Sequence, residues 1–260
     1  MAKAIDEDHA KELGLEKEVI DELGQKYDDL LDFLLLLALS QTISKQRKLT
    51  LASQKVAQYR AFNEVFSRTR GETAYNLGKN SAYRETGSAI QKMSSAQEKE
   101  LAGLVAQMNA DLNARLGVYE SNFKKLTYKV DLANLRENLL GFAPFDEQRL
   151  FADGRSKKKD LLFLDSKGRR ISNKVIMSVG AGDILWDTIN SGKRSVYLKL
   201  GITHAMHFSI VDDRTTPICL SLDRTIRDLR KDRIPPMHPR CRSKVRAIDP
   251  ETGEIFKKKI

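Results

Sequence analysis

The 260-residue chain has few of the features that mark secreted or membrane proteins. It contains only two cysteines, too few for the disulfide framework of a small secreted protein. Its one strongly apolar run, within residues 30–39, is much shorter than the roughly 20 residues that span a bilayer. An acidic stretch precedes this run, where a signal peptide would be basic. We therefore expect a soluble protein, made in a cytoplasm, with no membrane partner.

Proline and aromatic residues are also scarce. There is no proline before Pro144, and only 7% of the residues are aromatic. Apolar residues recur at spacings of three and four in residues 20–39, 49–66 and 73–90, and from Ser94 or Ser95 to Tyr119, which predicts four amphipathic helices. Ser95 and Glu98 have the spacing of a capping box, whereas Gly78 and Gly87 weaken the third helix. The N-terminal half is thus predicted to be an elongated helical platform that docks on protein.

The sequence changes character after Pro144. Residues 152–159 predict a linker, residues 161–177 a hairpin, and residues 183–200 a helix that Gly192 interrupts. Residues 202–211 predict a central strand, residues 244–248 a further short strand, and residues 249–253 a turn. We expect an α+β fold with a helical domain over residues 1–145 and a small domain with a short antiparallel sheet over residues 146–260.

Basic residues are unevenly distributed along the chain. Residues 151–260 hold 24 Lys and Arg against 13 Asp and Glu, a net charge of +11, whereas residues 1–150 hold 21 against 22, a net charge of −1. The whole positive excess therefore belongs to the C-terminal part. A basic domain joined to a neutral one indicates that the first part contacts protein and the second a polyanion. The simpler alternative is a solvated basic surface with no partner.

Both cysteines lie in two short segments of distinctive sequence. The first reads DRTTPIC from Asp213 to Cys219 and is followed by Leu222 and Asp223; the second reads PPMHPRCRS from Pro235 to Ser243. Their order, spacing and residue identities resemble the C-terminal signature of the phage Mu F-like minor head proteins, also called head morphogenesis proteins. The resemblance covers residues 200–248, and the helical N-terminal half is compatible with it.

This resemblance implies a structural role and no enzymatic activity. It implies a low-copy minor head (minor capsid) protein of a tailed bacteriophage that acts in head morphogenesis at the portal vertex. The expected location is the head interior of the virion, and the host cytoplasm during assembly. The helical platform would dock on portal, major capsid or scaffolding protein, and the basic domain would contact packaged double-stranded DNA.

Two rival functions come from other classes of protein. The first is a metal-dependent nuclease or toxin-like effector enzyme, for which the sequence offers neither a paired-carboxylate cluster nor H-N-H spacing. The second is a free DNA-binding protein that is insensitive to sequence and belongs to no particle.

Cys219, His238 and Cys241 are the candidates for a special site. Some members of the family carry two further cysteines where this chain has Thr216 and Ser243, so a four-cysteine zinc site is excluded. One interpretation is zinc held by these three residues, with a fourth ligand from His204, His207, Asp213 or Asp223. The favoured interpretation is that the two thiols pack face to face, free in the cytoplasm or as a disulfide outside the cell. A catalytic Cys-His pair ranks last, because no orienting acid accompanies it.

The motif residues together are predicted to form a structural clasp that joins two strands. The clasp comprises Asp213, Arg214, Thr215, Cys219, Asp223, His238 and Cys241. The insert between its halves is basic, with only Asp228 and Asp232 to offset it, and it lacks aromatic residues for base stacking. We therefore expect phosphate contacts that are insensitive to sequence, made by Arg224, Arg227, Arg230, Lys231, Arg233, Arg240 and Arg242. Apart from the zinc ion, no cofactor is expected.

Overall fold

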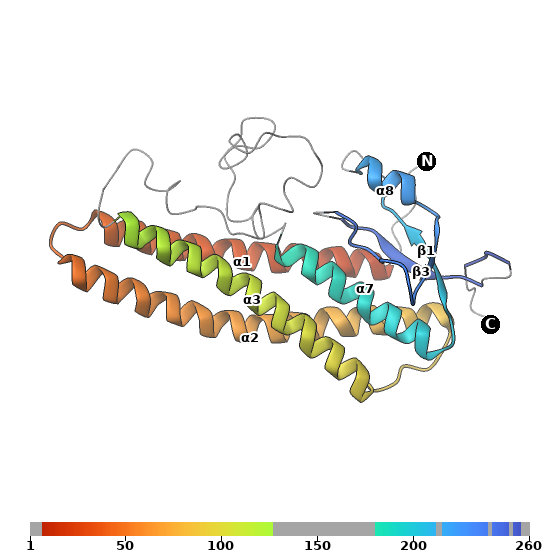
Figure 1. The fold of residues 1–260 in the computed structure, drawn as a ribbon. Coiled ribbons are helices and arrows are strands. Elements are labelled where there is room, and N and C mark those ends of the chain that lie inside the picture. The colour runs from red at the N-terminus through yellow and green to blue at the C-terminus, as the bar shows by residue number, and fades with distance from the viewer. Residues whose placement is uncertain (1–6, 127–179, 212–214, 239–240, 250–251, 256–260) are drawn as a thin grey trace. The chain divides into compact units, whose positions relative to one another are not determined.

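The computed structural model describes residues 7–126, 180–211, 215–238, 241–249 and 252–255. Three long helices come first, α1 (Glu7–Leu39), α2 (Lys45–Thr86) and α3 (Ser95–Leu126), as Figure 1 shows. They are followed by α7 (Ala181–Lys199), β1 (His204–Phe208), α8 (Pro217–Leu222), β2 (Ile226–Asp228) and β3 (Lys244–Ala247). The predicted α+β fold, with long N-terminal helices and a small antiparallel sheet in the C-terminal part, is confirmed. No helix in these described ranges is long and apolar enough to cross a membrane.

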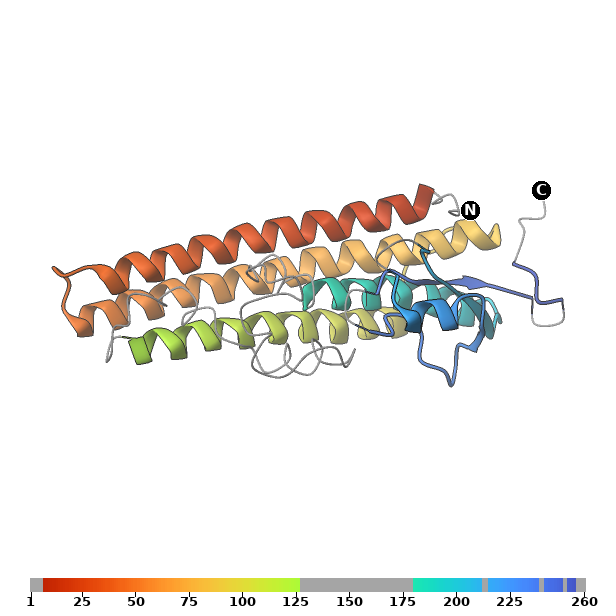
Figure 2. The same cartoon turned by 90° about the horizontal axis from the view of Figure 1, so that it is seen from above.

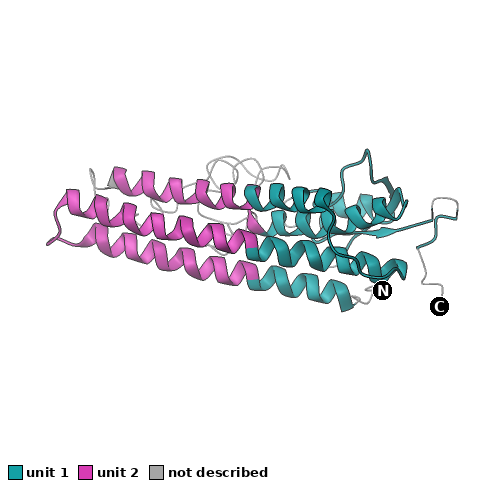
Figure 3. Cartoon of the chain, turned by 90° about the horizontal axis from the view of Figure 1, so that it is seen from below, with its two compact units in different colours: residues 1–18, 69–106, 182–260 teal, residues 19–68, 107–181 magenta. Residues whose placement is uncertain are grey.

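The described residues group into two compact units, and each long helix contributes to both. Unit 1 combines residues 1–18, 69–106 and 182–260, and unit 2 combines residues 19–68 and 107–181 (Figure 3). The C-terminal sheet therefore shares a unit with segments of all three long helices. The boundary predicted between residues 145 and 146, and the hairpin predicted over residues 161–177, lie outside the described residues.

The described part of unit 2 consists of segments of α1, α2 and α3, which run side by side (Figure 2). Its core is closed by the apolar stripe of α1, including Leu23, Leu30, Leu31 and Leu34, none of which is exposed. The Tyr27 hydroxyl lies within this core, where it accepts a hydrogen bond from Asn63 Nδ2 (3.0 Å) and donates one to the Leu112 carbonyl (3.0 Å). Burial raises the pKa of Tyr27 well above its ordinary value. This tyrosine therefore satisfies polar groups of α2 and α3 inside an apolar bundle.

The ends of the helices depart from the sequence prediction in two places. Helix α2 is continuous over residues 45–86, where two helices were predicted, and it ends where Gly87 adopts a positive φ of 70°. The Ser88 N–H then donates to the Tyr83 carbonyl (3.0 Å), as in a Schellman motif. The capping box of α3 is formed by Ser94 and Gln97, one residue before the predicted pair, with Ser94 N–H donating to Gln97 Oε1 (2.9 Å).

The sheet of unit 1 has the strand order β2-β1-β3, and both pairings are antiparallel. The prediction of a central strand within residues 202–211 is confirmed, as is that of a short strand beginning at Lys244. One core joins the sheet to the C-terminal end of α2 and to α7; it includes Tyr83, Tyr197, Ala205, Leu229 and Val245, which are all fully buried. The sheet thus depends on α2 and α7 for its apolar cover.

Two glycines allow α2 and α7 to touch backbone to backbone. A Cβ atom on Gly78 would collide with the carbonyl of Ile189, and one on Gly192 would collide with the carbonyl of Tyr75. Gly192 does not interrupt the helix as predicted, because α7 runs through it from Ala181 to Lys199. Both glycines therefore serve close packing between helices.

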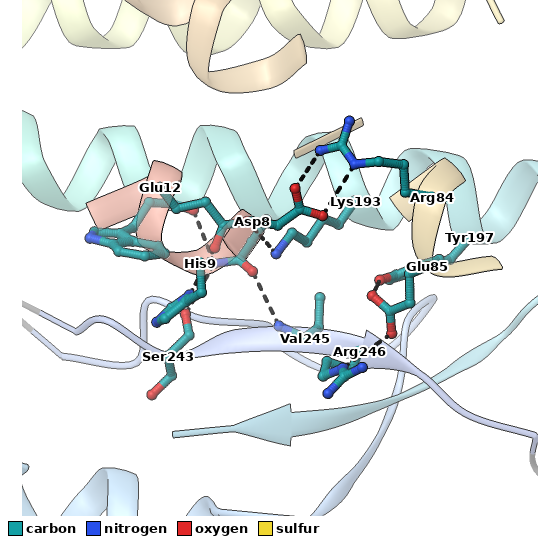
Figure 4. Close-up of polar contacts among 12 residues, drawn as sticks. Asp8, His9, Glu12, Arg84, Glu85, Lys193, Tyr197, Ser243, Val245 and Arg246 are labelled. Atoms are coloured by element: carbon teal, nitrogen blue, oxygen red, sulfur yellow. Dashed lines mark hydrogen bonds and ion pairs between the residues drawn. The ribbon is translucent and has the colours of Figure 1, made fainter. Parts of the chain in front are cut away.

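A group of buried charges joins the start of α1 to α7 (Figure 4). Glu12 and Lys193 form an ion pair (2.5 Å) in which the two side chains are 0% and 1% exposed. His9 contacts Glu12 through Nδ1 (2.9 Å), and its ring lies 5.5 Å from that of Trp186. Burial raises the pKa of the Glu12 carboxyl, but the charge of Lys193 and hydrogen bonds from His9 and Lys193 outweigh it and bring the pKa to about 2. Glu12 is therefore a carboxylate at neutral pH.

Candidate metal centre and basic hairpin

Helix α8 positions Cys219, and its own start is fixed by Thr216 and Pro217. Thr216 is the N-cap residue, and its hydroxyl accepts a hydrogen bond from Cys219 N–H (3.3 Å), while Pro217 occupies the first turn, where a missing N–H costs nothing. Ser209 Oγ, just beyond β1, donates to the Cys219 carbonyl (2.8 Å). The sequence did not predict this helix, which has six residues.

Cys219 from α8 meets His238 and Cys241 from the segment before β3. Cys219 Sγ lies 2.8 Å from His238 Nε2 and 3.6 Å from Cys241 Sγ. The three possible ligand atoms all lie within 4.8 Å of one another. Both cysteines are free and buried, and His238 is half-buried. The cluster is thus compatible with a bound metal ion.

Thr216 and Ser243 line the same cluster. Thr216 Oγ1 lies 2.8 Å from His238 Nε2, and Ser243 Oγ lies 3.2 Å from Cys219 Sγ. Five side chains of the two motif segments therefore meet in one place. A small pocket opens beside them, lined by Ile210, Thr215, Thr216, Cys219, His238, Arg242 and Ser243.

The two thiols have unequal proton affinities. The hydrogen bond between Cys219 and Cys241 lowers the pKa of the Cys241 thiol, and a contact with His238 lowers it further. The same hydrogen bond, together with burial, raises the pKa of Cys219. The pair therefore resembles a thiol that donates to a thiolate. Cys219, with its raised pKa, is unlike a catalytic nucleophile, which needs a lowered pKa and access to substrate. Cys241 has a lowered pKa, but its side chain is fully buried.

His207 lies beside the cluster on the buried face of β1. The sequence predicted it only as one of four alternative fourth ligands for zinc. Its side chain is 0% exposed, and neither ring nitrogen has a hydrogen-bond partner in the described part of the chain. Burial lowers the pKa of its imidazole, and the charge of Cys241 opposes that shift. His207 is therefore a neutral ring with two unsatisfied nitrogens.

The other candidate ligands and clasp residues have different surroundings. His204 lies at the start of β1, with Nδ1 2.9 Å from Thr203 Oγ1. Asp223 accepts a hydrogen bond from Ser209 N–H (2.9 Å), and Thr215 donates to the Ile210 carbonyl (2.6 Å). Asp213 and Arg214 lie outside the described residues. The described clasp residues therefore hold the loops around the cluster.

The basic insert folds into a hairpin-like excursion that contains β2. Strand β2 pairs with β1, and a turn follows in which Asp232 Oδ2 accepts from Asp228 N–H (2.9 Å) and Asp228 Oδ1 accepts from Arg230 N–H (2.8 Å). Asp228 and Asp232 thus each accept a hydrogen bond from a backbone N–H of the turn. We call residues 224–233 the basic hairpin.

Most cations of the basic hairpin face solvent. Arg224, Arg230, Lys231 and Arg233 are the more open ones, whereas Arg227 is half-buried. Two of them have exposed ionic contacts, Arg224 with Asp223 (3.9 Å) and Lys231 with Asp228 (3.6 Å), and such pairs contribute little. Arg233 donates to the Pro236 carbonyl (3.1 Å). Arg242 lines the pocket beside the cysteines, and Arg240 lies outside the described residues.

No family model matches this chain, and searches of curated proteins and of solved structures found no match either.

Proposed function

We propose that this chain is a structural minor head protein of a tailed bacteriophage, with its helices docked on portal, capsid or scaffolding protein and its basic hairpin directed at packaged DNA. The observation that carries the proposal is the meeting of the two motif segments. Cys219 and Cys241 are 22 residues apart, yet their sulfurs lie 3.6 Å apart, and the insert between them is basic and largely exposed. The two motif segments therefore form a compact structure, from which the cationic side chains of the basic hairpin extend into solvent.

Backbone conformation supports the use of these side chains. Arg224 adopts φ of 62°, a left-handed conformation that costs a non-glycine residue about 1 kcal/mol or more. The arginine side chain at this position is exposed. An arginine that occupies this unfavourable backbone conformation at an exposed turn is consistent with a contact between its side chain and phosphate.

DNA contact is tested with the full-length protein and duplexes of unrelated sequence. We expect binding that weakens steeply as salt rises and does not depend on sequence. The triple variant Arg230→Gln/Lys231→Gln/Arg233→Gln should lower the slope of log K against log salt by about 0.9 for each phosphate that the protein no longer neutralises, roughly 3 in all. The measurement is fluorescence anisotropy over a salt series.

A matched control variant distinguishes loss of the basic hairpin's phosphate contacts from a general loss of net positive charge. Lys45→Gln/Arg47→Gln/Arg68→Gln removes the same three charges from exposed positions on α2. It should leave the salt slope unchanged. Equal effects of the two triple variants would contradict DNA contact by the basic hairpin.

The head assignment itself is tested in particles. Quantitative mass spectrometry of heads purified from the phage that encodes this chain should find a few copies in each head. Absence from the heads, with DNA binding intact, would favour the free DNA-binding protein. Metal-dependent cleavage of plasmid DNA by the purified protein, abolished in His238→Ala, would favour the nuclease.

We further propose that the metal ion that fits the Cys219–His238–Cys241 cluster is structural zinc. Thiolate and imidazole ligands suit tetrahedral Zn²⁺. Two sulfurs that each lie about 2.3 Å from a tetrahedral zinc are separated by about 3.8 Å, and the two sulfurs here are 3.6 Å apart. When bound, zinc would join α8 to the segment before β3, on either side of the basic hairpin.

A further inference from the structure

We propose that His207 is the fourth ligand of this metal centre, giving a site of two cysteines and two histidines. The inference rests on the zinc proposed above. It adds a ligand from the middle of the sheet to three ligands from loops and from α8.

The first argument is the unsatisfied chemistry of His207. A buried imidazole normally donates from one nitrogen and accepts at the other. Here both nitrogens lack a hydrogen-bond partner among the described residues, and the side chain is fully buried. Leaving such a group unsatisfied destabilises the folded state, because the buried nitrogens lose their hydrogen bonds to water. A metal–nitrogen bond would remove that cost at one nitrogen.

The second argument is where the sheet holds His207. Its N–H donates to the Thr225 carbonyl, and its carbonyl accepts from Arg224 N–H, each at 2.8 Å. On its other side it is paired with Val245, two residues after Ser243 of the cluster. Cys241, Asp223 and His238 all act electrostatically on its ring. The residue is thus fixed in the sheet beside the cluster and beside the root of the basic hairpin.

The third argument is the number of ligands. Structural zinc sites are almost always four-coordinate and closed to water. The cluster supplies three strong ligands, and the two remaining polar side chains, Thr216 and Ser243, are hydroxyls, which are not among the usual zinc ligands. His207 is not among the three residues whose ligand atoms already lie within 4.8 Å of one another, so binding requires a movement of its ring or of the loops.

The test combines zinc affinity with stability in one variant, His207→Phe, which keeps an aromatic ring and removes both nitrogens. Without metal, the variant should be as stable as the wild-type protein or more stable, because two unsatisfied nitrogens are gone. With zinc, its affinity should fall by at least roughly tenfold to a hundredfold, the range seen when even an outer partner of a ligand is removed. Its gain in Tm on addition of zinc should shrink accordingly.

Cobalt provides the structural readout, because Co²⁺ in a tetrahedral thiolate and imidazole site has strong visible absorption. The wild-type protein loaded with Co²⁺ should show the bands of a four-coordinate site, and His207→Phe should show a weaker, altered spectrum. His204→Phe is the matched control, since this histidine lies three residues away on the same strand and its side chain therefore points to the opposite face. It should bind zinc and cobalt as the wild-type protein does.

Different results would overturn the two proposals separately. If metal-free wild-type protein takes up no zinc in a titration followed by native mass spectrometry, the zinc proposal is wrong. If it takes up one zinc ion and His207→Phe binds with unchanged affinity and an unchanged cobalt spectrum, zinc stands and His207 is not a ligand.

Discussion

Glu12 and Lys193 form an ion pair that neither water nor salt can reach. Removing water from two charges is costly, and their attraction offsets that cost only while both partners are present. Such a pair therefore adds little net stability, and its main effect is to determine which segments pack together. Here it fixes the first turns of α1 against α7, inside unit 1.

The pair should make the free energy of unfolding of unit 1 decrease at acidic pH. The folded-state pKa of Glu12 is about 2 against an ordinary 4.5, so its contribution is fully present above pH 4.5 and is lost as pH falls toward 2. We expect a decrease of about 3 kcal/mol over this interval. Chemical unfolding of the wild-type protein at a series of pH values measures it.

Variants isolate this decrease from that of other carboxyl groups. Glu12→Gln and Lys193→Met should each cost about 3–5 kcal/mol at pH 7, because each leaves a buried group without its partner. The double variant Glu12→Leu/Lys193→Met should recover most of that stability and should have a shallower acid dependence than the wild-type protein. A double variant as unstable as the sum of the single ones would contradict a paired role.

At the same scale, the sequence predicted some site residues and not others. Cys219, His238 and Cys241 were recognised because their segments have a distinctive order and spacing. His207 was one of four alternatives, since being unsatisfied is a property of its surroundings and is invisible in sequence. The partnership of Glu12 with Lys193 was not predicted, because charged residues at distant positions normally face solvent.

Two glycines allow the backbones of α2 and α7 to pack directly against each other in unit 1. Gly78 on α2 faces Ile189 on α7, and Gly192 on α7 faces Tyr75 on α2. Sequence reasoning treated both glycines as weak points of their helices. Their actual role depends on a neighbouring helix, which local periodicity cannot reveal.

Gly78→Ala and Gly192→Ala should each destabilise the protein by about 1–3 kcal/mol or more, because the added methyl group collides with backbone that cannot rotate away. Thermal unfolding monitored by circular dichroism measures the effect. The control is Gly103→Ala on α3, where an added Cβ meets nothing within 4 Å. It should stabilise the helix by about 0.5–1 kcal/mol. A destabilised control, to the same extent as Gly78→Ala, would rule out the packing explanation.

Most long helices were predictable, and the short elements were not. The apolar stripe of α1, with Leu23, Leu30 and Leu34, has the helical period over many turns, so its signal is strong. Strand β2 has only three residues, Ile226 to Asp228, and lies among arginines, so no alternation could identify it. Helix α8 has six residues, too few to show a period.

The division into units follows from contacts between distant parts of the chain. Ala82 and Tyr83 of α2 belong to the same core as Val196, Tyr197 and the sheet. The charge difference between residues 1–150 and 151–260 is a property of the sequence and does not coincide with this grouping. A basic C-terminal part can therefore carry its own function while it depends on the N-terminal helices for its fold.

Fragments test this dependence. Residues 151–260 expressed alone should show no cooperative thermal transition, because their sheet lacks the cover that α2 provides. Co-expressed with residues 1–150, they should co-purify and regain a cooperative transition. A cooperative transition in the isolated C-terminal fragment would contradict the composite unit.

The buried pairing of Glu12 with Lys193 also sets an order in time. A ribosome adds about 5–20 residues per second, so Glu12 is added roughly 9 to 36 seconds before Lys193. During synthesis the first turns of α1 have no partner in α7, whereas residues 19–68 and 107–126 can already pack together. Unit 2 is therefore the part of the chain that can form first on the ribosome, and the cysteine cluster and basic hairpin are completed last.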